Sequence, residues 1–214
     1  MRALAIFLLL LIAPAAWAAA VPVAQVDNPH TRVEIFVESL RARPGAPLWV
    51  AVRFTPEPGW HTYWKNYGDS GKEPGLAWSL PEGWSAAEPL YPVPERIPVG
   101  PLMNYGYERP QSLLVALTPP ADAAPGLVPV RLDADWLVCE EICVPEDAAL
   151  DFSLAVGEGT ADTLAPEVFA AARAALPQPS PWTATAAASA NAFRLMLGMD
   201  RAEVALVRDA YFFP

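Results

Sequence analysis

Hydrophobic and polar residues alternate in five segments of the chain, which predicts five strands that each bury one face. The alternating apolar positions are Val33, Ile35, Val37; Leu48, Val50, Val52, Phe54; Leu113, Val115, Leu117; Val130, Leu132, Ala134, Trp136, Val138; and Leu150, Phe152, Leu154, Val156. Short strands with one apolar face each need a second sheet to cover that face. The pattern therefore predicts an all-β fold, an immunoglobulin-like β-sandwich over residues 19–158.

Turn signals separate these segments. They are Pro44-Gly45, Pro58-Gly59, Pro81-Glu82-Gly83 and Pro92-Val93-Pro94. The chain has 25 prolines in 214 residues, a composition that disfavours long helices and suits short strands joined by rigid turns.

The pattern changes after residue 158. An alanine-rich segment from Ala161 to Leu176 predicts a short helix, and Pro177 to Pro181 continues it as a stiff spacer. We expect residues 159–181 to link two domains. Alternation resumes at Phe193, Leu195 and Leu197 and again from Val204 to Val207. Residues 182–214 are therefore expected to be the truncated start of a second β-sandwich domain.

The first residues have the layout of a secretory signal peptide. Met1-Arg2 precedes an apolar run from Ala3 to Ile12, and Ala16-Trp17-Ala18 supplies an Ala-x-Ala cleavage site. The apolar run is shorter than the roughly 20 residues that span a membrane. We expect residues 1–18 to be removed and the protein to reach the bacterial periplasm, where disulfides persist. The net charge of -10 argues against nucleic acid or an anionic membrane surface as a partner.

The only two cysteines, Cys139 and Cys143, lie three residues apart at the end of a predicted strand. In that strand the apolar residues occupy even positions, whereas Cys139 shares the odd face with Arg131, Asp133 and Asp135, so Cys139 is expected to point away from the core. A turn at Glu140-Glu141-Ile142 would place the two cysteines opposite each other at about 5.5 Å between Cα atoms, within disulfide range.

Such a disulfide is either a structural staple or a reversible redox pair. A loop of about five residues stabilises a fold by only about 2 kcal/mol in the chain-entropy model, against about 4.7 kcal/mol for a loop of 100. The position is therefore a weak one for a staple.

The residues around the pair bear on two further properties, metal binding and the pKa of the thiols. A metal site is not expected, because His30, His61 and the methionines have no ligand-like spacing to the cysteines. Nor is the pair a Cys-x-x-Cys at a helix N-terminus, which lowers the pKa of a thiol. Acidic neighbours disfavour a thiolate and predict a slow, selective nucleophile. They are Asp133, Asp135, Glu140 and Glu141.

Three blocks, taken together, resemble a known family. They are Trp136-Leu137-Val138-Cys139-Glu140-Glu141-Ile142-Cys143-Val144-Pro145-Glu146, Trp60-His61-Thr62-Tyr63-Trp64-Lys65-Asn66-Tyr67-Gly68-Asp69-Ser70-Gly71 and Met103-Asn104-Tyr105-Gly106-Tyr107-Glu108. Over roughly residues 28–156 the chain resembles the periplasmic N-terminal domain of the DsbD family of thiol:disulfide interchange proteins, in particular the branch of the ScsB-type reductases.

The resemblance implies a function in electron relay. An immunoglobulin-like domain would take electrons from a membrane-embedded donor domain and pass them to oxidised thioredoxin-fold proteins of the periplasm. By position, Cys143 matches the attacking cysteine and Cys139 the resolving one. The resemblance implies no cofactor, whether metal, nucleotide or flavin, and no small-molecule substrate, and it implies that the full-length protein is anchored in the inner membrane.

The resemblance also implies a cap loop over the cysteines. Tyr105-Gly106 matches its Tyr-Gly, and Asn104 stands where well-known members have the capping phenylalanine, so Tyr105 or Tyr107 is the candidate lid. From the residues themselves, Trp60, Tyr63 and Trp64 could form a stacking surface for partners or a buried cluster, and His61 among them is expected to be a hydrogen-bonded structural residue.

Two other functions stay open at this stage. One is a non-catalytic β-sandwich binding module that uses the aromatics between Trp60 and Trp64 and a static disulfide. The other is a periplasmic copper-handling protein in which Met103 or His61 joins the cysteines.

Overall fold

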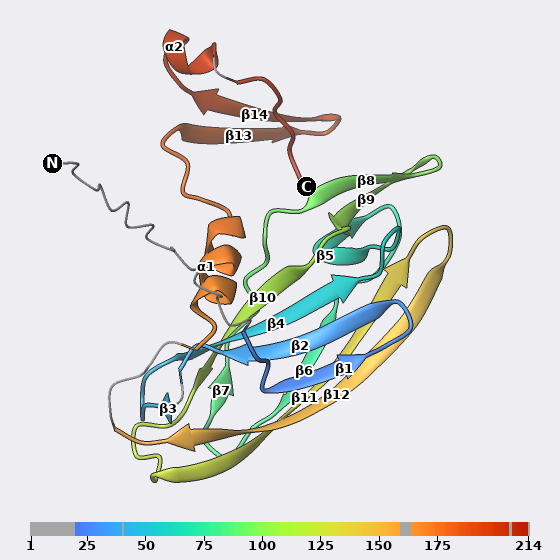
Figure 1. The fold of residues 1–214 in the computed structure, drawn as a ribbon. Coiled ribbons are helices and arrows are strands. Elements are labelled where there is room, and N and C mark those ends of the chain that lie inside the picture. Colours follow the sequence, from blue (N-terminus) through green and yellow to red (C-terminus); the bar gives the residue numbers. More distant parts are fainter. Residues whose placement is uncertain (1–19, 40, 159–163, 206, 214) are drawn as a thin grey trace, which may run out of the picture.

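The computed structural model describes residues 20–39, 41–158, 164–205 and 207–213 (Figure 1). The expected signal peptide, residues 1–18, lies outside the described residues. In the part that is described, no helix is long and apolar enough to cross a membrane.

Two sheets pack face to face. The first has the order β1-β2-β4-β10-β7 and consists of β1 (Ala24–Asp27), β2 (Thr31–Val37), β4 (Leu48–Pro56), β10 (Gln111–Thr118) and β7 (Ser85–Ala86). The second has the order β3-β12-β11-β6 and consists of β3 (Arg41–Ala42), β12 (Cys143–Val156), β11 (Gly126–Cys139) and β6 (Gly75–Ser79). The predicted sandwich is confirmed.

The alternating residues meet in the space between these sheets. Val33, Val52 and Phe54 on one side are fully buried against Leu132 and Trp136 on the other, and the indole of Trp136 meets the ring of Phe54 edge to face. All five predicted strands contribute to this core because each has its apolar face on the inside. The turns at Gly45, Gly59 and Gly83 have positive φ, which glycine adopts without strain.

A third sheet, in which hydrophobic alternation is weak, stands at one end of the sandwich. Its order is β5-β9-β8, with β5 (Thr62–Gly68), β9 (Leu102–Tyr107) and β8 (Glu95–Val99). The cap loop expected at residues 104–107 is thus a strand, the central one of this sheet. Its backbone can pair closely with β5 because Gly106 has no side chain, and a Cβ there would lie 2.0 Å from the carbonyl oxygen of Thr62.

Helix α1 (Pro166–Ala175) begins later than expected and is not a free spacer. It covers the outer face of the first sheet, where its Val168, Phe169 and Ala172 pack against Phe36 and Leu114. Arg173 also makes two hydrogen bonds to Glu38, at 2.6 and 2.8 Å. Helix α1 is therefore packed on the sandwich, because its apolar stripe finds partners on the sheet. That residues 159–181 link two domains stays a prediction, and residues 159–163 lie outside the described residues.

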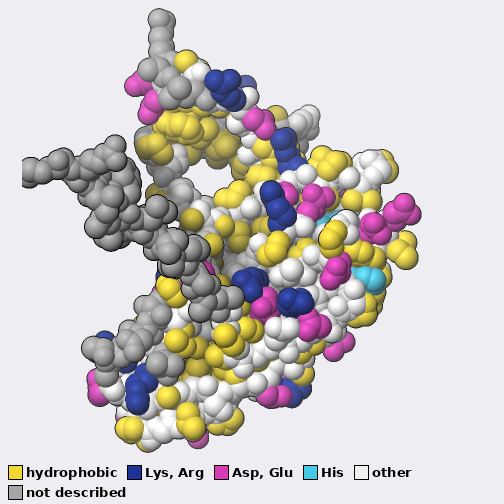
Figure 2. Space-filling view, viewed as in Figure 1, with side chains coloured by type: hydrophobic (Ala, Val, Ile, Leu, Met, Phe, Trp, Pro, Cys, Tyr) yellow, Lys and Arg dark blue, Asp and Glu magenta, His cyan; other side chains and the backbone are white. Residues whose placement is uncertain are grey.

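The C-terminal part is a hairpin followed by one short helix. Strands β13 (Thr183–Ser189) and β14 (Ala192–Gly198) pair with each other, and α2 (Arg201–Val204) follows. The strand expected from Val204 is wrong, because this position ends a helical turn. Figure 2 shows hydrophobic side chains gathered on the hairpin, among them the exposed Phe193, Leu195 and Leu197.

Candidate functional site

The two cysteines are joined by a disulfide at the closed end of the β11–β12 hairpin. Cys139 and Cys143 face each other in the strand register with the expected three residues between them. Their Cα atoms are 4.2 Å apart, closer than expected. The reason is that Cys139 directs its backbone N–H and C=O to His61, with N···O distances of 3.0 and 2.8 Å. Facing residues without mutual hydrogen bonds approach more closely than hydrogen-bonded pairs.

The two sulfur-bearing residues differ in exposure. Cys139 lies on the outer face of the second sheet, as strand phase predicted, but only 2% of its surface is exposed, and its backbone is paired with that of His61. Cys143 is exposed. A molecule that approaches from solvent therefore reaches Cys143 and not Cys139.

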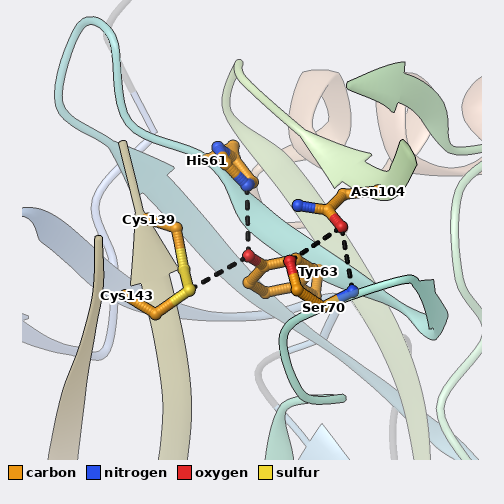
Figure 3. Close-up of a disulfide and its surroundings, with 6 residues drawn as sticks. All are labelled: His61, Tyr63, Ser70, Asn104, Cys139 and Cys143. Atoms are coloured by element: carbon orange, nitrogen blue, oxygen red, sulfur yellow. Dashed lines mark hydrogen bonds between the residues drawn. A yellow bond between two sulfur atoms is a disulfide. The ribbon is translucent and has the colours of Figure 1, made fainter. Parts of the chain in front are cut away.

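Tyr63 is the side chain that touches the disulfide. Its hydroxyl lies 3.4 Å from Sγ of Cys143 and 3.2 Å from Nε2 of His61, between the two in Figure 3. Tyr63 and His61 are both buried. Burial raises the pKa of Tyr63, against the effect of a hydrogen bond with Ser70, and burial lowers the pKa of His61. The two groups are therefore neutral at about pH 7, and each offers one hydrogen-bonding proton.

A short loop after β5 fixes the ring of Tyr63. Gly71 lies against this ring so closely that a Cβ at its position would be 2.3 Å from ring carbons. Ser70 donates from its N–H and its hydroxyl to Oδ1 of Asn104, at 3.1 and 2.9 Å, and Met103 donates its N–H to Asp69 at 2.8 Å. Strand β9 thus holds the loop, and the loop holds the tyrosine.

Comparison with known proteins bears on this arrangement. The family model described as "Thiol:disulfide interchange protein DsbD, N-terminal" matches residues 30–155, more than half of the chain. The chain belongs to this family. The matched range leaves out β1 but includes the sandwich strands from β2 to β11, all of β12 except Val156, both cysteines and the third sheet, which confirms the resemblance found in the sequence.

In fold, this DsbD-family chain is similar to the crystal structure of the N-terminal periplasmic domain of ScsB from Proteus mirabilis. The TM-score is 0.60 with 17% sequence identity, over 84% of this chain and 69% of that chain. At this identity the likeness concerns the fold. No curated protein matches the sequence.

The aromatic residues of the DsbD-family motifs have distinct positions. Tyr63 has no exposed surface, so it supports the disulfide from inside and cannot form a docking surface. Trp60 is half-buried and stacks on His30 with ring centroids 3.8 Å apart. Trp64 is half-buried and its ring meets that of Phe213 edge to face.

The candidate lid residues do not lie over the sulfurs. Gly106 pairs with Tyr63 in the register, and Asn104 shares its face of β9. Tyr105 and Tyr107 therefore project from the opposite face, where the Tyr107 hydroxyl donates to the carbonyl of Pro92 and the Tyr105 hydroxyl contacts that of Tyr211. Asn104 is buried and contributes through Ser70.

Two of the four acidic residues do not surround the sulfurs. Asp133 pairs with Arg131, which lowers the pKa of its carboxyl, and Asp135 pairs with Lys72. Both lie down the strand from Cys139, at roughly 13 to 20 Å by the rise of about 3.3 Å per residue. Glu140 and Glu141 remain beside the disulfide, exposed in the hairpin loop. The expected acidic influence is thus confined to the loop.

No group of three or more His, Cys, Asp and Glu side chains in the described part of the chain is arranged to hold a metal ion. The sequence pattern missed the contribution of Ser70 and Gly71. For Tyr63 it left a stacking surface and a buried cluster open, and the structure has the buried arrangement. The signal that could have found them is the Trp60 to Gly71 block, whose closely spaced glycines indicate close packing against a neighbour.

Proposed function

We propose that this domain is a periplasmic electron relay in which Cys139 and Cys143 cycle between dithiol and disulfide. The observation that carries the proposal is the unequal exposure of the two cysteines, with Cys143 open to solvent and Cys139 buried. An attacking cysteine needs access to a partner's disulfide, whereas a resolving cysteine needs only to reach the first sulfur.

Each half-reaction conserves electrons. The Cys143 thiolate attacks one sulfur of an oxidised partner, forming a mixed disulfide and releasing the partner's other sulfur as a thiolate that takes up a proton. The Cys139 thiolate, its own proton lost to solvent, then attacks Cys143 Sγ. The intradomain disulfide forms again and the partner leaves as a dithiol, having gained two electrons. Reduction of the domain by its donor follows the same steps in reverse.

Tyr63 supports the first step. Its single hydroxyl proton has three neighbouring acceptors, which are His61 Nε2, the sulfur of Cys143 and the hydroxyl oxygen of Ser70. With the His61 proton on Nε2, the imidazole donates to the phenolic oxygen and the hydroxyl donates to sulfur. This orientation stabilises a thiolate at Cys143, because hydrogen bonds to charged acceptors are stronger than those to neutral ones.

The partners in this proposal are those of the family. The donor is a membrane-embedded domain of the same or a separate chain, and the acceptors are oxidised thioredoxin-fold proteins. Family membership and the exposed Cys143 support this assignment, and protein-disulfide reduction would be the activity of the full-length enzyme.

Trapping of the mixed disulfide tests the roles of the cysteines. An oxidised thioredoxin-fold protein is mixed with reduced Cys139→Ser and Cys143→Ser variants, and adducts are counted on non-reducing gels. The Cys139→Ser variant should accumulate a mixed disulfide because its attacking sulfur is present and resolution is blocked. The Cys143→Ser variant should not, because its remaining thiol is buried. Equal trapping by both variants would refute the assignment.

A redox titration separates a relay from a staple. Structural disulfides in exported proteins resist reduction to below about -300 mV, whereas relay pairs are reduced at higher potentials. We expect the Cys139–Cys143 disulfide to be reduced in glutathione or dithiothreitol buffers above that value. A disulfide that stays intact far below it is a structural bond.

A further inference from the structure

The outer face of the third sheet carries a row of three large side chains, one from each strand. Arg96 of β8 pairs with Tyr105 of β9 in the register, and Trp64 of β5 follows Tyr63, which pairs with Gly106. These three side chains share the face of the sheet opposite to Asn104. The row therefore presents one guanidinium and two aromatic rings side by side.

A segment near the C-terminus lies along this row. Asp209 accepts a hydrogen bond from Arg96 at 2.9 Å, and the same guanidinium lies 4.7 Å from the ring centroid of Tyr211. The hydroxyl of Tyr211 is 2.6 Å from that of Tyr105. Figure 1 shows this end of the chain next to β8.

Phe213, after Asp209 and Tyr211, is the third residue of this segment that contacts the row. The ring of Phe213 lies 5.2 Å from that of Tyr105 and 5.8 Å from that of Trp64, edge to face in both cases. Contacts are thus made by residues 209, 211 and 213, the period of two of an extended chain. Phe212 points elsewhere and stacks on Phe193 of the hairpin with centroids 5.4 Å apart. The segment offers an acidic group to the guanidinium and two aromatic rings to the aromatic positions.

We propose that Arg96, Tyr105 and Trp64 form a docking surface for an extended segment of the form Asp-x-Tyr-x-Phe, and that residues 209–213 are its occupant. Recognition of alternate side chains is a general way in which a sheet selects an extended peptide. The inference goes beyond electron relay, because it does not involve the sulfurs. It implies that the C-terminal hairpin is tethered to the end of the sandwich that carries the disulfide.

A peptide that competes with the tethered segment tests the proposal. The probe is a fluorescent peptide with the sequence of residues 207–213, and its binding to the purified chain is followed by anisotropy. A chain with Tyr211→Ala and Phe213→Ala, whose own segment cannot dock, should bind the peptide. The unaltered chain should bind it at least about tenfold more weakly, because a tethered segment has a high effective concentration. Equal binding to both chains, or none to the doubly substituted chain, would overturn the proposal.

Two controls identify the surface. A chain with Phe212→Ala should behave like the unaltered chain, because Phe212 makes its contact within the hairpin. Adding Arg96→Glu to the doubly substituted chain should weaken binding about fivefold, the upper range for an exposed ion pair, and an Asp209→Lys peptide should restore it. If neither Arg96→Glu in the chain nor Asp209→Lys in the peptide changes the affinity, the row does not recognise the segment. The unfolding midpoint of each chain is measured to establish that the sandwich is intact.

Discussion

Substitution of Tyr63 by phenylalanine removes one buried hydroxyl and keeps the ring on which Gly71 packs. The hydroxyl lies 3.4 Å from Sγ of Cys143. A hydrogen bond to a charged group contributes about 1.5 to 3 kcal/mol, and about 1.4 kcal/mol corresponds to a factor of ten in an equilibrium. If Tyr63 donates to the Cys143 thiolate, its loss should reduce the thiolate population at neutral pH about tenfold or more.

Alkylation by iodoacetamide measures this population, because the thiolate and not the thiol reacts. The assay uses chains that also carry Cys139→Ser, so that Cys143 is the only thiol present. We expect Tyr63→Phe to slow alkylation at neutral pH about tenfold. Tyr67→Phe is the matched control, because Tyr67 belongs to the same strand and is 40% exposed.

An unchanged alkylation rate in Tyr63→Phe would refute the reasoning, since it would mean that the hydroxyl donates to His61 or Ser70 and not to sulfur. Near-ultraviolet circular dichroism is measured for Tyr63→Phe with both cysteines present, so that a displaced ring is not mistaken for the effect of the missing hydroxyl. A faster rate would also contradict the proposed donor direction.

Three further predictions concern the surroundings of the site. Gly71→Ala should lower the free energy of unfolding by about 1 to 3 kcal/mol, because its Cβ would meet the ring of Tyr63. Gly100→Ala is the control, because Gly100 also has a positive φ but no atom lies within 4 Å of its Cβ position. Gly100→Ala should lower the free energy of unfolding by less, and equal losses would refute the clash. Phe169→Ala should cost about 3 to 5 kcal/mol in urea unfolding, and no effect would mean that α1 is not part of the domain. Burial lowers the pKa of His61, so the unfolded protein binds more protons at this side chain than the folded protein does. The free energy of unfolding should therefore fall as the pH drops through about 6.5. A His61→Gln chain whose free energy of unfolding falls equally steeply with pH would contradict this.

The sandwich and the hairpin could be predicted because both depend on local pattern. Alternation assigned the core faces of the five strands. The three residues between Cys139 and Cys143 made a short hairpin loop predictable, in which the two cysteines face each other. The burial of Cys139 could not be predicted, because His61, with which its backbone is paired, lies 78 positions earlier in the chain. Strand phase determines which face a side chain lies on, but only tertiary packing determines whether that face meets solvent.

The third sheet and α1 show two other limits of local pattern. Strand β9 contains Asn104 and Gly106, which are depleted in strands, and it forms because Asn104 satisfies the loop at Ser70 and Gly106 permits close pairing. Helix α1 was expected at about the right place. Its packing against the sheet could not be predicted, because an alanine-rich segment has few large apolar residues to mark a buried face. One of them, Phe169, supplies the fully buried contact with the sheet.

From the backbone bonding of the hairpin tip we expect the two sulfurs to differ in freedom of motion after reduction. Cys139 is held by two backbone hydrogen bonds to His61, which do not involve its sulfur. Cys143 faces Cys139 without such bonds, and among the described strands the other neighbour of β12 is β3, which pairs only at Ala155 and Val156. Once the S–S bond is broken, thermal motion can carry Cys143 outward with its loop while Cys139 stays in place. In the proposed relay, the mobile Cys143 sulfur would make the first contact with a partner, and the fixed position of Cys139 would let the disulfide form again at the same place.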